Sequence, residues 1–362
     1  MSEPQKSGTH GTPTGRRVVC GILPPYILHK LTEADDPHVR EAARNTLAID
    51  AEFRANRVAT PSLVSPAMPE DFVLQRTIYD THHTAELPGD VVREEGGQPV
   101  LDGTANRAYE SLGLTFDFFK EVYGRHSIDD ANLPLDATVH YRRRFNNAFW
   151  DTQQMVFGDG DGIVFNDFTI SHDIVAHELT HGVTQYTAGL VYQDQAGALN
   201  ESISDVFGSL VKQYARRQNA DEADWLIGAG LFTPAVRGQA LRSMKAPGTA
   251  FDDAQLGGAD PQPSHMTHYV RGTFDHGGVH INSGIPNHAF YLTAVAIGGY
   301  AWERAGKIWY DTITSGRLAE NATFEQFAHV TADVAEHLYG TRSELDAVMK
   351  AWSDVGVNVN GA

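Results

Sequence analysis

The residues best suited to chemistry are two histidines in His177-Glu178-Leu179-Thr180-His181, a run whose apolar positions predict a helix. His177 and His181 are four residues apart, so on a helix their imidazoles share one face and can bind one metal ion. Glu178 follows the first histidine, and its carboxylate can reach a metal-bound water without being a ligand. The alternative is a solvated helical face, since the chain has 17 histidines and a short match can arise by chance.

A second segment, Asn200-Glu201-Ser202-Ile203-Ser204-Asp205, could complete the metal site. An open tetrahedral zinc site needs three protein ligands, and two histidines with one glutamate form an attested set. Glu201 is therefore the candidate third ligand. Asn200 and Asp205 lie one residue before and four after it, where each could accept the second N–H of a ligand histidine. An ordinary exposed helix carboxylate is the alternative for Asp205.

A third block, Asp275-His276-Gly277-Gly278-Val279-His280-Ile281-Asn282-Ser283-Gly284, contains glycines that permit close backbone approach. His280 could donate a hydrogen bond to a developing oxyanion, and Asp275 could orient it. A loop with a hydrogen-bonded histidine is the alternative interpretation of this block.

The elements that must position these residues divide the chain into a strand-rich half and a helical half. One long helix, residues 104–123, interrupts strand patterns at residues 73–79, 91–93, 137–141, 146–150 and 155–157. Residues 158–162, Gly-Asp-Gly-Asp-Gly, form a turn by composition, and the glutamate that closes a twelve-residue calcium loop is missing. Helices are expected at residues 173–186, 200–217, 287–297, 303–314, 323–338 and 343–355. The sequence therefore predicts an α+β fold with a cleft between the halves.

The first 60 residues differ from the rest in charge. They carry eight Lys+Arg and seven Asp+Glu, whereas the remaining residues have a net charge of -19. Three prolines, Pro61, Pro66 and Pro69, favour an extended linker between the two parts. A helix expected at residues 37–57 is too short to hold a core, so we expect this segment to dock on the body.

Composition excludes several classes of protein. A net charge of -18 argues against nucleic acid or an anionic membrane as a partner, because both require a basic surface. A single cysteine, Cys20, permits no intramolecular disulfide. No apolar run approaches the roughly 20 residues of a membrane span. Residues 1–15 are polar and lack the apolar core of a secretory signal.

Taken together, these motifs resemble thermolysin-like zinc metalloproteases over residues 75–360. The resemblance is carried by five blocks: His177 to His181, residues 200–205, Asn147-Ala148 with the turn at 158–162, the Leu-Arg-Ser-Met of residues 241–244, and residues 275–284. Pro24-Pro25-Tyr26 resembles the motif of the short propeptide in the protealysin subgroup.

The resemblance implies a propeptide at residues 1–60, a β-rich peptidase domain with the zinc helix at 61–187, and an α-helical peptidase domain at 188–362. It implies a neutral zinc endopeptidase that is made as a zymogen and cuts on the N-terminal side of bulky hydrophobic residues. We expect peptide substrates, the protein's own propeptide as a partner, and a monomer. The resemblance implies secretion, without a recognisable signal peptide; a cytoplasmic location is the alternative.

Residue roles follow from the matching positions. His177, His181 and Glu201 would bind zinc, and Glu178 would be the general base that activates its water. The oxyanion would be stabilised by His280, which Asp275 orients, and by Tyr192. The substrate backbone would be held by Asn147, by the Ala148 carbonyl and by Arg242. The pocket for the residue after the cut bond would be lined by Phe165, Phe168, Ile174, Ile227, Leu231 and Leu241, although plain core packing is the alternative for these six.

One position departs from the family's calcium cluster. Asp173 and Asp224 fit that cluster, but Lys212, Leu226 and Ala229 stand where further carboxylates are expected. A lysine ammonium can replace part of a cation's charge, so the sequence predicts a weakened or absent calcium site.

Two roles remain open for the N-terminal segment: an inhibitor that places Tyr26 or its neighbours in the cleft until cleavage near residues 50–65, or a folding helper. Cys20 is expected to be a small buried residue, with a zinc-bound thiolate as the alternative. For the whole chain, the alternatives are another zinc hydrolase, such as an aminopeptidase, and a catalytically inactive binding protein that retains the fold.

Overall fold

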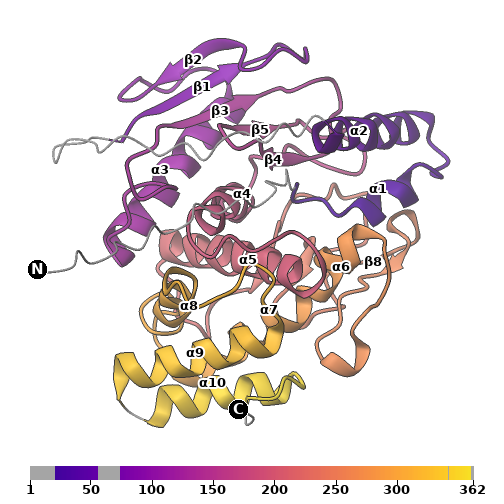
Figure 1. The fold of residues 1–362 in the computed structure, drawn as a ribbon. Helices are drawn as coiled ribbons and strands as arrows, with labels where there is room; N and C mark the ends of the chain where they lie inside the picture. Colours follow the sequence, from indigo (N-terminus) through magenta and orange to yellow (C-terminus); the bar gives the residue numbers. More distant parts are fainter. Residues whose placement is uncertain (1–20, 56–73, 341, 360–362) are drawn as a thin grey trace, which may run out of the picture.

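The computed structural model describes residues 21–55, 74–340 and 342–359. These form two lobes, a sheet lobe at the top of Figure 1 and a helical lobe below it. The architecture is α+β, as the sequence predicts. Residues 1–20, which include Cys20, and residues 56–73, which include the proline linker, lie outside the described residues.

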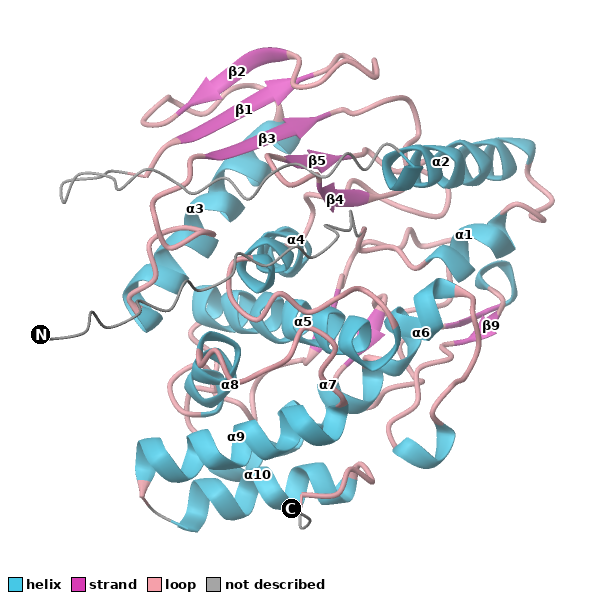
Figure 2. Ribbon diagram, in the orientation of Figure 1, coloured by secondary structure: helices cyan, strands magenta, loops and turns pink. Residues whose placement is uncertain are grey.

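The sheet lobe contains five strands in the order β2-β1-β3-β5-β4. The bounds are β1 (Arg76–Asp80), β2 (Asp90–Glu94), β3 (Leu135–Val139), β4 (Ala148–Trp150) and β5 (Met155–Phe157). β1, β3 and β5 run parallel to one another, whereas β2 and β4 pair antiparallel at the two edges. α3 (Gly103–Tyr123) packs against this sheet, as Figure 2 shows. The side chain of Asp102 caps the start of α3, and Gly124 ends it in a left-handed conformation.

Two helices at the centre of the molecule carry the metal-binding motifs. α4 (His172–Gln185) and α5 (Asp194–Arg216) pack against each other between the lobes. Every residue of α4 from Asp173 to Thr184 is buried, which explains why polar residues within it need partners from other elements. α5 begins six residues earlier than the expected start at residue 200, so the motif around Glu201 lies inside the helix.

The helical lobe contains α6 (Asp275–Asn282), α7 (Gly284–Ile297), α8 (Ala305–Thr314), α9 (Phe324–Tyr339) and α10 (Arg342–Asp354). Its short elements are β6 (Leu226–Ile227), β7 (Arg242–Ser243), η1 (Ala254–Leu256), η2 (Met266–His268), and the hairpin strands β8 (Asp252–Asp253) and β9 (Gly258–Ala259). A capping box between Thr323 and Gln326 starts α9. The last four predicted helices therefore form close to their expected bounds, while α6 is a helix that the sequence did not predict.

The N-terminal segment docks on both lobes. It forms α1 (Pro25–Leu31) and α2 (Pro37–Ala55), and α1 contacts both α2 and η1. In Figure 1 these two helices lie at the right of the molecule, α2 beside the sheet lobe and α1 below it. Its apolar side chains are buried in the main core: Ile22, Leu23, Ile27, Leu28, Leu31, Val39 and Ala43. The segment has no separate core, which agrees with the expectation from its length.

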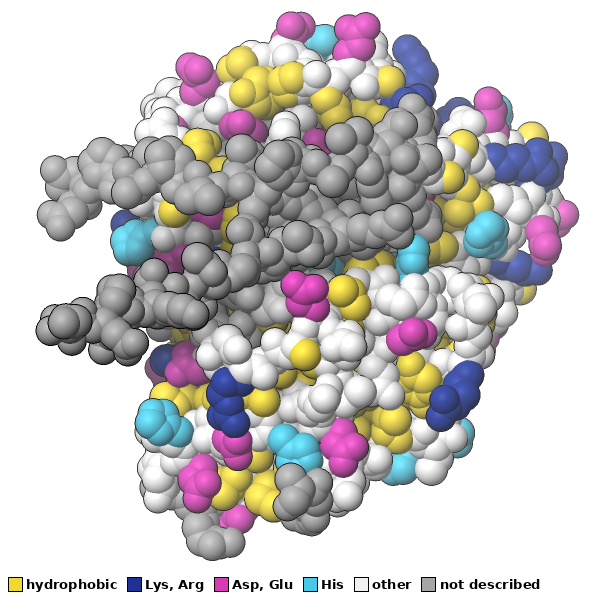
Figure 3. Space-filling model, in the orientation of Figure 1, with side chains coloured by type: hydrophobic (Ala, Val, Ile, Leu, Met, Phe, Trp, Pro, Cys, Tyr) yellow, Lys and Arg dark blue, Asp and Glu magenta, His cyan; other side chains and the backbone are white. Residues whose placement is uncertain are grey.

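Two surface properties bear on possible partners. None of the helices among the described residues combines the length and apolarity that a bilayer span requires. On the face drawn in Figure 3, acidic side chains are scattered over both lobes instead of gathering in one patch.

Candidate metal centre

The two histidines of α4 and one glutamate of α5 bring three ligand atoms together. His177 Nε2 and His181 Nε2 lie 3.1 Å apart. Each lies 3.5 Å from a carboxylate oxygen of Glu201. Ligands at zinc distances of about 2.0–2.2 Å on a tetrahedron would be separated by roughly 3.3 Å. The three side chains are buried, and their spacing fits one small metal ion.

The second nitrogen of each histidine is held by a side chain of α5. His177 Nδ1 lies 2.8 Å from Asp205 Oδ1, and His181 Nδ1 lies 2.8 Å from Asn200 Oδ1. Ser204 Oγ also approaches His181 Nδ1, at 3.1 Å. Because these acceptors favour a proton on Nδ1, the lone pairs of both Nε2 atoms face each other and Glu201. A pair of facing lone pairs is unfavourable unless a cation lies between them.

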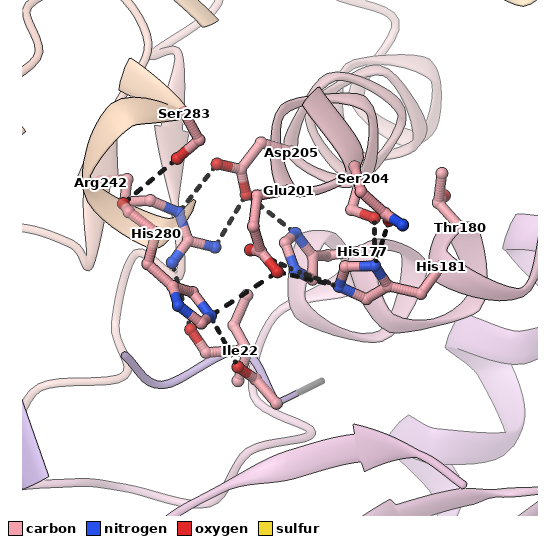
Figure 4. A network of polar contacts seen from close by, with 12 residues as sticks. Ile22, His177, Thr180, His181, Glu201, Ser204, Asp205, Arg242, His280 and Ser283 are labelled. Atoms are coloured by element: carbon pink, nitrogen blue, oxygen red, sulfur yellow. Dashed lines mark hydrogen bonds and ion pairs between the residues drawn. The ribbon is translucent and has the colours of Figure 1, made fainter. Parts of the chain in front are cut away.

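Asp205 links the metal centre to the cleft, as Figure 4 shows. Arg242 donates to both of its oxygens, from Nε and Nη2, at 2.8 Å each. Asn287 donates to Oδ2, also at 2.8 Å. Burial alone would raise the pKa of Asp205, but attraction to Arg242 and His177 outweighs it and holds the pKa at about 2. The carboxylate therefore stays charged and fixes both a ligand histidine and an arginine.

Glu178 lies beside this cluster with no hydrogen-bond partner. Both of its carboxylate oxygens are buried and unpaired among the described residues, as is Glu201 Oε2. Burial raises the pKa of Glu178 to about 8. Orphaned carboxylates are costly in a protein interior, whereas a bound cation with its water would satisfy them. The residues present therefore fit a metal ion at His177, His181 and Glu201.

α6 and the segment just before α5 place two polar groups, His280 and Tyr192, beside the metal ligands. His280 Nδ1 lies 2.7 Å from Asp275 Oδ1, and the Asp275 carboxylate also accepts the His280 backbone N–H at 3.0 Å. Burial would lower the pKa of His280, but the charges of Asp275 and Glu201 outweigh it and raise the pKa to about 9. Tyr192 donates to Glu201, and its hydroxyl lies 3.1 Å from His280 Nε2.

The N-terminal segment passes through this cleft as an extended strand. Gly21 forms an antiparallel bridge with Phe149 of β4. The Ile22 N–H donates to the Ala148 carbonyl at 3.2 Å, and the Leu23 N–H donates to Asn147 Oδ1 at 3.0 Å.

Side chains of the helical lobe bind the carbonyls of the same strand. Arg242 Nη1 donates to the Ile22 carbonyl at 3.1 Å, and His280 Nε2 lies 3.3 Å from the Gly21 carbonyl oxygen. Figure 4 shows Ile22 between Arg242, His280 and the metal ligands. The three residues expected to hold a substrate backbone, Asn147, Ala148 and Arg242, thus hold the protein's own backbone.

The apolar residues that were expected to line a pocket belong to the same core cluster as Ile22. The six apolar residues expected to line a pocket are almost fully buried: Phe165, Phe168, Ile174, Ile227, Leu231 and Leu241. Pro24 is buried, Pro25 starts α1, and Tyr26 is half-buried with a hydroxyl that has no partner. Burial, followed by the charge of Asp260, raises the pKa of Tyr26 well above its usual range.

The position of the expected calcium cluster is filled by a lysine. Lys212 Nζ lies 2.9 Å from Asp173 Oδ2 and 2.8 Å from Asp224 Oδ1, and it donates to the Leu226 carbonyl. Burial would lower the pKa of Lys212, but the two carboxylates outweigh it and raise the pKa. A buried ammonium thus stands among oxygens that could otherwise bind a cation.

Several contacts of the centre were not predicted. Ser204 lies three residues after Glu201, so helical spacing could have indicated it. Asn287 and Gln262, whose Nε2 donates to the His280 carbonyl at 2.8 Å, act through tertiary contacts that leave no local pattern.

The site has three parts: a helix with two metal-binding histidines and a glutamate, a third ligand on the next helix, and a sheet edge that binds an extended chain. Together these parts define a metallopeptidase. Comparison with known proteins gives the family. Residues 76–185 match the thermolysin metallopeptidase catalytic domain, and residues 188–357 match its alpha-helical domain. The chain belongs to the thermolysin family and is a metalloendopeptidase.

Two relatives and one solved structure match this chain over nearly their whole length. An extracellular metalloprotease of Pectobacterium carotovorum subsp. carotovorum is 49% identical over 343 residues, which are 95% of this chain and 98% of the relative. Protease PrtS of Photorhabdus sp. (strain Az29) is 45% identical, covering 94% and 92% of the two chains. The solved structure of the precursor of protealysin from Serratia proteamaculans is 49% identical with a TM-score of 0.85, over 93% of this chain and 99% of the other.

Proposed function

We propose that the chain is a neutral zinc endopeptidase, made as a zymogen, that cuts peptide bonds on the N-terminal side of bulky hydrophobic residues. The observation that carries this proposal is the strand in the cleft. Its Gly21 carbonyl lies at His280, and the next residue, Ile22, is hydrogen-bonded to Ala148 and Arg242. A substrate held in this register would present one peptide bond to Glu178 and the metal ligands.

The roles of the polar residues follow from their surroundings. When bound by His177, His181 and Glu201, zinc supplies a Lewis acid and lowers the pKa of water. Glu178, unpaired and buried, would take the proton of the attacking water and deliver it to the leaving amine. The raised pKa of His280 favours the imidazolium, which would donate to the oxygen that gains charge. Tyr192 would donate beside it, and Asp275 would keep the imidazolium in place.

The backbone-binding residues support cutting within a chain. Asn147, Ala148 and Arg242 bind backbone groups of Ile22 and Leu23. None of these three residues binds a free amino terminus, and an aminopeptidase needs a group that does. Strand addition to β4 gives affinity without restricting most side chains. The burial of the Ile22 side chain in the main apolar core supports a preference for a bulky hydrophobic residue after the cut bond.

The N-terminal segment supports synthesis as a zymogen. Residues 21–23 occupy the positions where a substrate backbone would bind, and α1 and α2 bury apolar side chains against the enzyme body. The related solved structure is itself named a precursor. We place the propeptide at residues 1–60, the β-rich domain at 61–187 and the helical domain at 188–362. An extracellular location follows from the relative named extracellular.

We also propose that no calcium binds between Asp173 and Asp224. The Lys212 ammonium, within 2.9 Å of both carboxylates, already neutralises this position.

The test uses chain freed of its N-terminal segment and a denatured protein as substrate. We expect internal cuts before Ile, Leu or Phe, mapped by mass spectrometry, and loss of activity with a zinc chelator that added zinc reverses. Glu178→Gln should lower the turnover rate by at least about 100-fold while zinc binding remains, because a positioned general base contributes about 10²–10⁴-fold. Glu336→Gln, on the exposed face of α9, is the matched control.

Each alternative function predicts a different result. Cleavage that persists in Glu178→Gln would refute the mechanism. Release of single residues from the amino terminus would indicate an aminopeptidase. Zinc binding without any cleavage would indicate an inactive binding protein.

A further inference from the structure

A second group of metal-ligating side chains lies on the sheet lobe and shares no residue with the centre described above. His83, His140 and Asp159 offer ligand atoms that all lie within 4.8 Å of one another. His140 Nδ1 lies 2.8 Å from Asp159 Oδ1, and His83 Nδ1 lies 3.3 Å from Asp159 Oδ2. The second separation equals the roughly 3.3 Å expected between two ligands of a tetrahedral zinc ion, and the first is shorter by about 0.5 Å.

The topology of the sheet explains why these residues meet. β1, β3 and β5 are neighbouring parallel strands, so their carboxyl ends lie at one edge of the sheet. His83, His140 and Asp159 follow the ends of these three strands, within three residues in each case. His83 and His140 both have left-handed backbone conformations, with φ of 63° and 54°. Non-glycine residues in this region carry strain, which here turns two imidazoles toward one carboxylate.

A further carboxylate orients the central histidine. His140 Nε2 lies 2.7 Å from Asp102 Oδ2, and the other oxygen of Asp102 accepts the Thr104 N–H at the start of α3. Asp102 is therefore fixed by the helix that it caps. Metal-binding histidines commonly donate their second N–H to a carboxylate in this way, which directs the other nitrogen to the ion. In this arrangement His140 Nδ1 faces Asp159 and His83.

The site is open on one side. A cavity of about 400 Å³ is lined by His83 and Asp159 together with Glu41 and Asn45 of α2, Arg143 and Arg144. His83 is 41% exposed, while the His140 side chain is 20% exposed. An ion can therefore enter from solvent, and a water can complete its coordination.

We propose that His83, His140 and Asp159 form a second zinc site on the sheet lobe, with Asp102 as the carboxylate that orients His140. Two imidazole nitrogens and one carboxylate oxygen suit zinc, whereas calcium and magnesium prefer oxygen ligands throughout. The competing explanation is a metal-free cluster in which a protonated His140 bridges Asp102 and Asp159.

Zinc stoichiometry decides between these two explanations. The probe is zinc alone, at buffered micromolar concentrations, added to the intact chain carrying Glu178→Gln to prevent self-cleavage. We expect two zinc ions per chain by equilibrium dialysis and elemental analysis. His83→Gln and, separately, Asp159→Asn should each reduce this to one. His82→Gln is the matched control, because His82 is an adjacent exposed histidine outside the group, and it should keep two.

The outcome is independent of catalysis. A second readout uses protein in which cobalt replaces zinc, because protein-bound cobalt absorbs visible light. We expect two absorption components in the parent and one of them in His83→Gln, in parallel with the loss of one ion. Circular dichroism establishes that each variant is folded. The proposal would be overturned by one zinc ion per chain in the parent, or by two zinc ions in both His83→Gln and Asp159→Asn. Neither result would bear on the proposed peptidase function.

Discussion

Replacing Lys212 by methionine is the sharpest test of how the body of this protein is stabilised without calcium. The Lys212 side chain is 2% exposed, and its ammonium lies within 2.9 Å of both Asp173 and Asp224. Methionine keeps the length of the side chain and removes the charge. Asp173, which is fully buried, would then lose its cation. Breaking a buried pair by removing one partner costs about 3–5 kcal/mol.

The lower end of that range applies here, because Asp224 is 33% exposed and water can replace part of its interaction. A loss of about 3 kcal/mol corresponds to roughly 4 °C in the melting temperature, because the entropy of unfolding is about 2.1 cal/mol/K per residue and the chain has 362 residues. Differential scanning calorimetry in the Glu178→Gln background measures it. Arg216→Gln is the control, since Arg216 contacts the same Asp224 at 3.4 Å from an exposed position. An equal melting temperature in the two variants would refute the reasoning.

The pH dependence of this difference has a defined sign. Burial opposes ionisation of both groups, but their mutual attraction lowers the pKa of Asp224 and raises that of Lys212. The Asp224 contribution is present above the unfolded pKa near 4 and is lost as pH falls through the folded value. The Lys212 contribution is present below the unfolded pKa near 10.4 and is lost as pH rises through its folded value. The parent and Lys212→Met should therefore differ most between about pH 5 and 9.

Three further results are expected. A calcium chelator that spares zinc should lower the melting temperature of the parent by less than about 10 °C, because Lys212 is proposed to take the place of calcium between Asp173 and Asp224. A larger drop contradicts this role of Lys212. Gly21→Ala should raise the peptidase activity of the uncleaved chain, since a Cβ at this position would lie 2.4 Å from the Asn147 amide; unchanged latency in a fluorogenic peptide assay would count against inhibition by this strand. Asp205→Asn should weaken zinc binding by about 10–100-fold in competition with a chromogenic chelator, as loss of a carboxylate that orients a ligand histidine does; unchanged affinity would show that Asp205 acts only on Arg242.

The sequence predicts the parts of this protein that rest on local periodicity. The spacing of His177 and His181 and the apolar pattern around them identify α4, and the strand patterns before it identify the sheet lobe. The motif around Glu201 has helical spacing, so Asn200 and Asp205 could be assigned to the two histidines before any contact was known.

The parts that were missed depend on the rest of the fold. No helix is predicted at Pro24-Pro25, yet Pro25 begins α1, because the first helical position needs no backbone N–H. No helix is predicted at residues 275–284 either, yet they contain α6, whose first turns include four consecutive left-handed residues from Asp275 to Gly278. Asn287 belongs to the site because its side chain donates to Asp205. A contact between residues so far apart in the chain produces no periodic pattern in the sequence.

The strand at Gly21 to Leu23 belongs to the same chain as the cleft that it fills, so the latency of the intact protein should not change on dilution. While the tether between α2 and β1 is intact, the strand competes with substrate at an effective concentration on the order of millimolar, whatever the protein concentration. Cutting the tether changes none of the contacts, but it makes their formation bimolecular. A nicked but undissociated protein would then remain latent in concentrated solution and become active on dilution alone.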